Sequence, residues 1–231
     1  MAQFIDTLTT WLFQYIVVWM LLGAGVFFTV RLNFIQFRRL PEAFRAMMAQ
    51  QSTAAGGVLT PFQSFMTALG ATIGTGNIAG VASAIISGGP GALFWIWVYG
   101  LVATAIKFSE ATLGVKYRKT VGDTVEAGPM HYLRDGFKSP GLAKAFALIA
   151  GIGALTTTPF TQPNSIAVVF ESVFGVPTIV AGLVVAVLVW AVIIRGIKSI
   201  GKAAEKLSPL KVGLYLAGGL TVILFHADRL P

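Results

Sequence analysis

The sequence predicts an all-α protein that crosses a membrane several times, and three observations lead to this prediction. Hydrophobic residues make up 55% of the 231 residues and charged residues only 11%, whereas ordinary soluble domains carry about a quarter charged residues. The mean hydropathy is +0.78. The charges gather between apolar runs, several of which reach the roughly 20 residues that a spanning helix needs. Because lipid offers no hydrogen bonds to the backbone, such runs must be helical, and the alternating pattern of a barrel is absent.

We expect six spans along the chain. The first lacks a basic leading segment and is long enough to cross, so it is not a cleavable signal. Glycines interrupt the second span, and Pro159 and Pro163 fall in the long fourth span, which predicts a kinked helix. The spans are expected at 11–30, 61–86, 92–113, 142–174, 178–194 and 209–225.

Two polar connections separate these spans. Asp123 and Glu126 have the spacing of a capping box, which predicts a short interfacial helix within residues 120–140. Residues 195–208 are basic and are also expected at the membrane interface.

The basic residues predict the orientation of the chain. With both ends outside, the inner loops hold all of the 17 Lys and Arg residues except Lys107 and Arg229. This bias is the positive-inside rule, and it accounts for the net charge of +8 without a nucleic-acid partner. The residues assigned to the inner loops are Arg31, Arg38, Arg39, Arg45, Lys116, Arg118, Lys119, Arg134, Lys138, Lys144, Arg195, Lys198, Lys202, Lys206 and Lys211.

The composition also excludes several kinds of site. There are no cysteines, and the two histidines, His131 and His226, lie too far apart in sequence to suggest a metal cluster. No nucleophile–base pair is evident, so we expect no enzyme. The polar residues are too isolated to line a channel. Lys107 and Glu110 lie one helical turn apart near the inner end of the third span, which predicts a structural or gating ion pair.

The most informative segment lies within the second span. Gly74, Gly76 and Gly80 occur within seven residues, together with Thr75 and Asn77. Glycine costs about 1 kcal/mol in a helix interior, so the helix can open here. Opening frees N–H groups that suit a carboxylate and carbonyls that suit a cation such as Na⁺, as in the broken helices of transporters. The glycine pairs 70/74 and 76/80 also suit close helix packing, and this alternative stays open.

A resemblance to a known family rests on several motifs. The run at 74–82 (GTGNIAGVA) leads into GGPGA at 88–92 and Phe94-Trp95, and then into KFSE at 107–110 and VKYR at 115–118. These segments resemble the alanine/glycine:cation symporters, also called the sodium:alanine symporters. Residues 127–132 (AGPMHY) match the family's Gly-Gly-Pro-Met-Tyr-Tyr segment with substitutions, and the resemblance covers nearly the whole chain.

The resemblance implies a fold and a location. Members of this family have about ten helices in a leucine-transporter-type inverted-repeat fold, in which an extra first helix precedes two five-helix repeats. Residues 1–231 would then be a single transmembrane domain with the extra helix at 11–30 and the first repeat at 61–225, and the second repeat would be absent. The expected location is the plasma (inner) membrane.

The resemblance also implies substrate-binding residues. The family's broken helix falls on Gly74–Asn77, where N–H groups around Thr75 and Gly76 would hold a substrate carboxylate and the Asn77 side chain would assist. Gln162 would hydrogen-bond the substrate, since the family has a Gln followed by Asn-Ser at the matching place, although Pro163 departs from the pattern. A helix–helix hydrogen bond is the alternative role for Gln162.

By a weaker analogy of fold, the resemblance implies a sodium site. Distant sodium-coupled relatives bind Na⁺ through carbonyls just before the break. The matching positions are Gly70, Thr72 and Ile73, with Asn77 as a side-chain ligand.

The function implied is sodium-coupled uptake of alanine or glycine by alternating access, with no cofactor other than the coupling ion. The expected partners are the amino acid, Na⁺ and the lipid bilayer. Two alternatives stay open: a proton-coupled amino-acid transporter, and a truncated, non-transporting fragment or assembly partner. The missing second repeat favours the latter.

Overall fold

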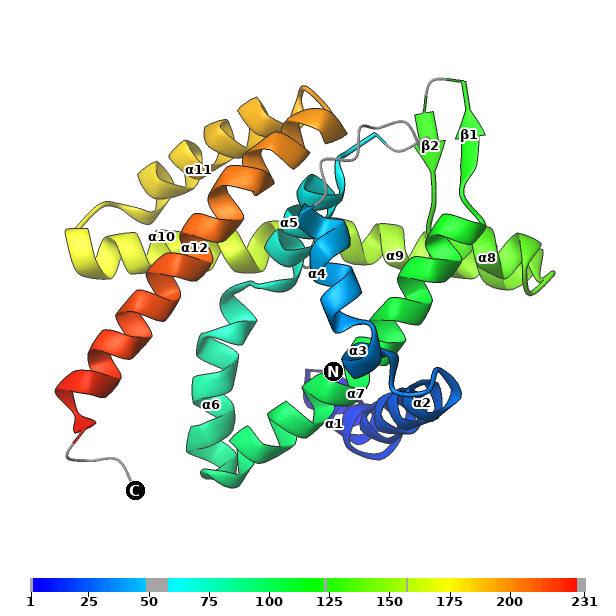
Figure 1. Cartoon of the computed structure of the whole chain (residues 1–231). Helices are drawn as coiled ribbons and strands as arrows, with labels where there is room; N and C mark the ends of the chain where they lie inside the picture. The colour runs from blue at the N-terminus through cyan, green and yellow to red at the C-terminus, as the bar shows by residue number, and fades with distance from the viewer. Residues whose placement is uncertain (1, 49–57, 123, 157, 228–231) are drawn as a thin grey trace. The chain divides into compact units, whose positions relative to one another are not determined.

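The computed structural model of the chain describes residues 2–48, 58–122, 124–156 and 158–227, which are mainly helical (Figure 1). They form two compact units, one of Met1–Phe44 and Gly80–Gly153 and the other of Arg45–Ala79 and Ala154–Pro231. The helices and strands are α1 (Ala2–Leu12), η1 (Phe13–Val17), α2 (Val18–Arg31), α3 (Ile35–Arg38), α4 (Leu40–Met48), α5 (Pro61–Thr72), η3 (Thr75–Asn77), α6 (Ala79–Gly88), α7 (Gly91–Lys116), β1 (Lys119–Val121), β2 (Thr124–Glu126), α8 (Pro129–Asp135), α9 (Pro140–Thr156), α10 (Thr158–Phe174), α11 (Thr178–Ile193) and α12 (Ile197–Phe225).

The described helices confirm the all-α membrane class. Four of them are long and apolar enough to cross a membrane, at Gln3–Arg31, Gly91–Lys116, Pro140–Phe174 and Ile197–Phe225. Together α5 and the Thr75–Gly88 segment pass the same test, which gives up to five spans. The expected fifth span corresponds to α11, which is apolar but has 16 residues, fewer than the roughly 20 of an ordinary span.

The connection after α7 differs from the sequence prediction. The strands β1 and β2 pair antiparallel, and Lys119 faces Glu126. Glu126 therefore lies on a strand, α8 begins after Gly128 with Pro129 at its first position, and Asp123 is outside the described residues. The predicted short helix within residues 120–140 is present as α8, but the capping box at its start was wrong, because a Gly-Asp pair between short Thr/Val segments is a hairpin signal. Gly122 adopts the positive φ of 59° that such a turn favours.

The last helix also differs from the prediction. Residues 195–208 do not form a separate interfacial segment, because α12 is one helix of 29 residues that continues through Pro209. Lys211 therefore lies near the middle of this helix and not in an inner loop.

The first unit packs around a close contact between α2 and α7. A Cβ atom on Gly25 would lie 2.9 Å from the Cβ of Val102, so the absence of a side chain lets the two helices approach. The predicted ion pair is present on α7, where Lys107 Nζ lies 2.9 Å from Glu110 Oε2.

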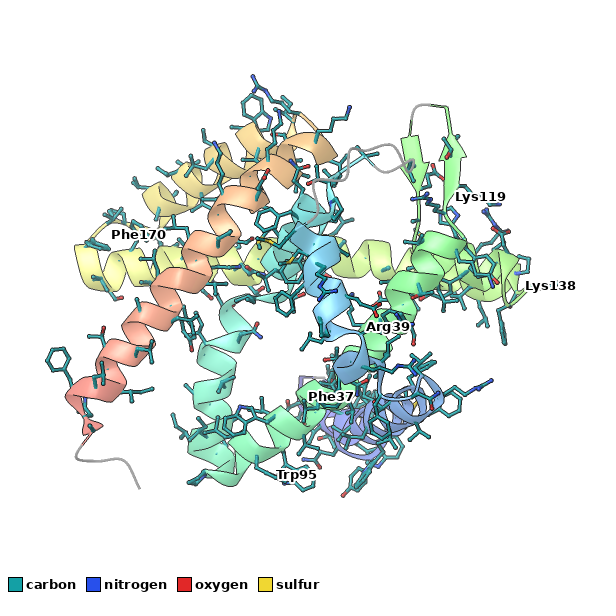
Figure 2. The ribbon with its side chains drawn as sticks, viewed as in Figure 1. Phe37, Arg39, Trp95, Lys119, Lys138 and Phe170 are labelled. Atoms are coloured by element: carbon teal, nitrogen blue, oxygen red, sulfur yellow. The ribbon has the colours of Figure 1, made fainter. Side chains whose placement is uncertain are left out.

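Large apolar side chains project outward from the helices (Figure 2). Trp95 on α7 is 63% exposed and Phe170 on α10 is 44% exposed. Outward-facing side chains of this size fit a lipid environment.

In the second unit, α5 lies beside α12. Helix α5 starts with a capping box in which the Thr60 hydroxyl accepts from the Gln63 N–H and the Gln63 side chain accepts from the Thr60 N–H. Gln63 Nε2 also donates to Glu205 Oε2 at 3.0 Å, and one turn later Ser208 Oγ donates to Met66 O at 2.9 Å. Since both helices advance by three residues between these contacts, α5 and α12 run in the same direction.

Candidate functional site

The expected interruption of the second span is present. Helix α5 ends at Thr72, and Ile73 and Gly74 then adopt extended backbone conformations before the single turn of η3. The interruption, residues 73–78, is hereafter called the break. Its local geometry follows from glycines that lower the cost of leaving the helix.

Asn77 closes the turn within the break. Its Oδ1 accepts a hydrogen bond from the Gly74 N–H at 3.0 Å, and its own N–H donates to Gly74 O at 3.1 Å. In the described part of the chain, the backbone N–H groups of Thr75 and Gly76 have no acceptor. Unpaired N–H groups at a helix start carry positive partial charge and attract anions.

A pocket of about 530 Å³ lies against the break within the second unit. Its wall comes from the break and the end of α5, from α10 and from α12, and most of the wall is apolar. The lining residues are Gly70, Ile73, Gly74, Thr75, Asn77, Ile78, Gln162, Lys211, Val212, Tyr215 and Leu216. A mostly apolar pocket with a few converging polar groups is typical of small-molecule sites.

The side chain of Gln162 lies directly against Gly74. A Cβ atom on Gly74 would be 3.1 Å from Gln162 Nε2 and 3.6 Å from its Oε1, so a side chain there would require the Gln162 amide to shift by a few tenths of an ångström. By contrast, a Cβ atom on Gly76 would meet nothing within 4 Å. The two glycines of the break therefore have different surroundings.

Lys211 reaches from α12 to the end of α5. Its Nζ donates to the carbonyl oxygen of Ile73 at 2.8 Å and lies 3.5 Å from that of Gly70. The last carbonyls of a helix have no partners within it and carry negative partial charge, so an ammonium is favoured there. This role was not predicted from the sequence, because the charge of Lys211 was taken as that of an inner loop. A lone lysine within an apolar run was the signal that could have revealed it.

The structure brings together most of the predicted site residues. Gly74, Thr75, Asn77 and Gln162 all line the pocket, whereas Gly76 does not. Three of the four predicted sodium-binding positions also line the pocket, namely Gly70, Ile73 and Asn77. Thr72 is not among them, and its hydroxyl donates to Ala68 O of its own helix.

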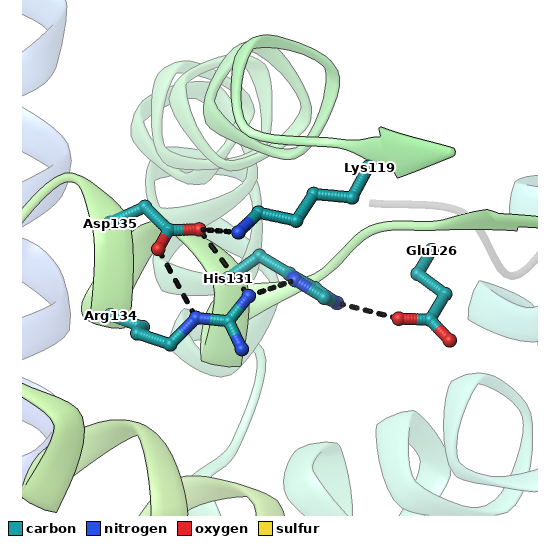
Figure 3. A network of polar contacts seen from close by, with 5 residues as sticks. All are labelled: Lys119, Glu126, His131, Arg134 and Asp135. Carbon is teal, nitrogen blue, oxygen red and sulfur yellow. Dashed lines mark hydrogen bonds and ion pairs between the residues drawn. The ribbon is translucent and has the colours of Figure 1, made fainter. Parts of the chain in front are cut away.

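A second polar cluster lies in the first unit, beside α8 (Figure 3). Asp135 pairs with Lys119 at 3.0 Å and with Arg134 Nε at 3.1 Å. These bonds, first that from Arg134 and then that from Lys119, lower the pKa of the Asp135 carboxyl. Arg134 also lies 3.3 Å from His131 Nδ1, and because arginine only donates, this nitrogen accepts. Glu126 completes this α8 network at 3.9 Å from His131 Nε2.

Within the residues described, no group of three or more His, Cys, Asp or Glu side chains is placed to hold a metal ion.

Comparison with known proteins gives a consistent match. The model of the sodium:alanine symporter family matches residues 1–231. The sodium/alanine symporter AgcS of Methanococcus maripaludis is 44% identical over 90% of this chain and 47% of its own length. The amino-acid carrier protein AlsT of Bacillus subtilis is 34% identical over 92% of the chain and 45% of its length. Another B. subtilis protein, YrbD, provisionally named a sodium/proton-dependent alanine carrier, is 35% identical over 100% of this chain and 47% of its own length. The chain thus spans a little under half the length of these relatives.

Proposed function

The chain belongs to the sodium:alanine symporter family, and we propose that it takes part in the uptake of alanine or glycine together with Na⁺. The family and the apolar helices identify a multi-pass protein of the plasma membrane. Transport breaks no covalent bond, so the site has only to bind the substrate and then release it.

The observation that carries this proposal is the break, with its unpaired N–H groups beside a pocket. An amino acid has a carboxylate, which the N–H groups of Thr75 and Gly76 would bind as they bind other anions at helix starts. The Gln162 amide beside Gly74 offers both a donor and an acceptor to the polar end of the substrate. The apolar wall that includes Ile78 and Val212 suits a hydrogen atom or a methyl group as the substrate side chain.

We further propose the leucine-transporter-type fold for the complete protein. The extra first helix would lie at 11–30 and the first repeat at 61–225, with a second repeat supplying the facing wall of the pocket. The interrupted second span supports this assignment, because discontinuous helices at repeat interfaces form the midplane sites of such transporters. Alternating access would then expose the break to each side of the membrane in turn.

Uptake by the complete protein in proteoliposomes tests the proposal. We expect labelled alanine to accumulate under an inward Na⁺ gradient and not under a K⁺ gradient of the same size. Accumulation driven only by a proton gradient would favour the proton-coupled alternative. No accumulation under any of these gradients would contradict transport of alanine.

Gln162→Ala tests the substrate site within the same assay. Losing a hydrogen bond to a charged group is worth roughly 1.5–3 kcal/mol, so we expect KM for alanine to rise about ten-fold or more. Asn164→Ala is the matched control, since Asn164 is exposed on the same helix and does not line the pocket. An unchanged KM with reduced protein abundance for Gln162→Ala would instead support a helix-packing role.

A further inference from the structure

The ammonium of Lys211 lies at the position predicted for Na⁺ at the end of α5. It donates to Ile73 O at 2.8 Å and lies 3.5 Å from Gly70 O. Both carbonyls belong to the predicted sodium ligands. A tethered ammonium and a free sodium ion have the same charge and seek the same oxygens, so they compete for this position.

One of the other two predicted ligands is also engaged. Asn77 Oδ1 accepts from the Gly74 N–H at 3.0 Å and so closes the turn of the break. Three of the four positions at which the fold analogy suggested a sodium ion therefore already have a hydrogen-bond partner within the chain.

The position of Lys211 is fixed by the packing of its helix. Glu205, Ser208 and Lys211 are three residues apart on α12 and contact successive turns of α5. In the described part of the chain no carboxylate forms an ion pair with Lys211. Among the described residues, backbone carbonyls are thus the groups that stabilise the ammonium, and they would otherwise be available to a cation from solution.

We propose that Lys211 is a built-in cation that fills the coupling-ion position at the end of α5 and keeps Na⁺ from the carbonyls of Gly70 and Ile73. This inference rests on the proposed function, because it concerns the ion site of the same transporter. Any Na⁺ that drives transport must then bind elsewhere or displace the ammonium.

Sodium-dependent stability of the purified complete protein tests the inference. Thermal unfolding is followed in detergent while Na⁺ replaces choline at constant ionic strength. In Lys211→Met the freed carbonyls should accept Na⁺, so the Na⁺ concentration for half-maximal stabilisation should fall at least ten-fold relative to wild type. If the wild type shows no stabilisation, a response should appear in the variant.

Two controls separate charge at this position from charge in general. Lys211→Arg keeps the positive charge and should respond to Na⁺ like the wild type. Lys206→Met removes a charge from an exposed position of the same helix and should also respond like the wild type. A folded Lys211→Met with an unchanged or lost Na⁺ response would overturn the inference.

A second variant covers the case in which Lys211→Met does not fold. Lys211→Gln is neutral but keeps an N–H donor for the end of α5, and it should shift the Na⁺ response in the same direction. If neither neutral variant folds in choline, Na⁺ should restore the folded yield by supplying the missing charge, and equal yields in both salts would overturn the inference. Failure of Na⁺-driven alanine uptake by the wild type would contradict the proposed function but not this comparison of stabilities.

Discussion

The α8 network and the pocket at the break each contain a lysine, and the positive charge of each lysine is stabilised by a different kind of group. Lys119 pairs with the carboxylate of Asp135 at 3.0 Å, and both side chains are partly exposed, by 47% and 30%. Lys211 is half-buried and donates to the backbone carbonyl of Ile73. Lys119 is stabilised by an oppositely charged side chain, whereas Lys211 is stabilised by a backbone carbonyl at the C-terminal end of α5.

The difference reflects the cost of burying charge. In water an ion pair is easily solvated and contributes little to stability, so the α8 network can gather five charged or titratable side chains (Figure 3). Within an apolar pocket, a carboxylate partner would add a second charge to be desolvated. Carbonyls left unpaired at the end of a broken helix stabilise an ammonium without adding a second charge that must be desolvated. A helix break in a membrane protein can therefore bind a charged side chain of the same protein as well as a ligand.

The largest expected effect comes from reversing the charge of each lysine. Lys211→Glu would place a carboxylate against carbonyl oxygens, and an uncompensated buried charge costs about 3 kcal/mol or more. Lys119→Glu should cause a much smaller loss, because Arg134 continues to pair with Asp135 at an exposed site. Unfolding of the complete protein by SDS titration measures both changes. Equal losses for the two variants would show that the proposed difference in environment does not hold.

A smaller effect is expected from adding a methyl group within the break. Gly74→Ala would place Cβ 3.1 Å from Gln162 Nε2, so the amide would have to shift by a few tenths of an ångström. We expect the affinity for alanine to fall by up to about ten-fold, the size of a lost hydrogen bond to a charged group. Gly76→Ala is the matched variant, because its Cβ would meet nothing within 4 Å.

Equilibrium binding of labelled alanine to the purified complete protein measures this pair of variants. The affinity of Gly76→Ala should remain close to that of the wild type, because this variant keeps the Gly76 N–H and its Cβ has open space. A larger loss in Gly76→Ala than in Gly74→Ala would mean that the substrate needs the open space beside Gly76 more than it needs the Gly74–Gln162 contact.

The smallest effect concerns the pH dependence of the α8 network. The pKa of Asp135 lies below its ordinary value of 3.8, chiefly because Arg134 and Lys119 hydrogen-bond its ionised form. A carboxyl whose pKa is lowered by folding stabilises the folded state above its unfolded pKa, and this contribution is lost as pH falls through the folded pKa. Asp135→Asn should therefore be slightly less stable than the wild type at pH 7. The difference should shrink below about pH 4.

Thermal unfolding of the wild type and Asp135→Asn across this pH range checks the expectation. The pocket provides the comparison, since Gln162→Ala removes no titrating group and should differ from the wild type by an amount independent of pH. A stability difference for Asp135→Asn that grows on acidification would contradict the assignment.

The sequence by itself determined the membrane class and the place where the second span opens. Both are local properties: apolar runs of sufficient length must be helical in lipid, and glycines at 74 and 76 lower the cost of leaving the helix. Within residues 119–126 the sequence was misread, although the Gly-Asp pair there is a local hairpin signal. The continuity of α12 through Pro209 also went unpredicted, because an internal proline ordinarily marks a helix end.

Only the tertiary structure decided which side chains meet the break. Lys211 lies 138 positions from Ile73 in the sequence, and Gln162 approaches Gly74 from α10. No local rule relates such positions, because their contact depends on the direction and register in which α5, α10 and α12 pack. The same carbonyls would be open to a sodium ion if α12 were rotated by a fraction of a turn, since Lys211 would then face away from them.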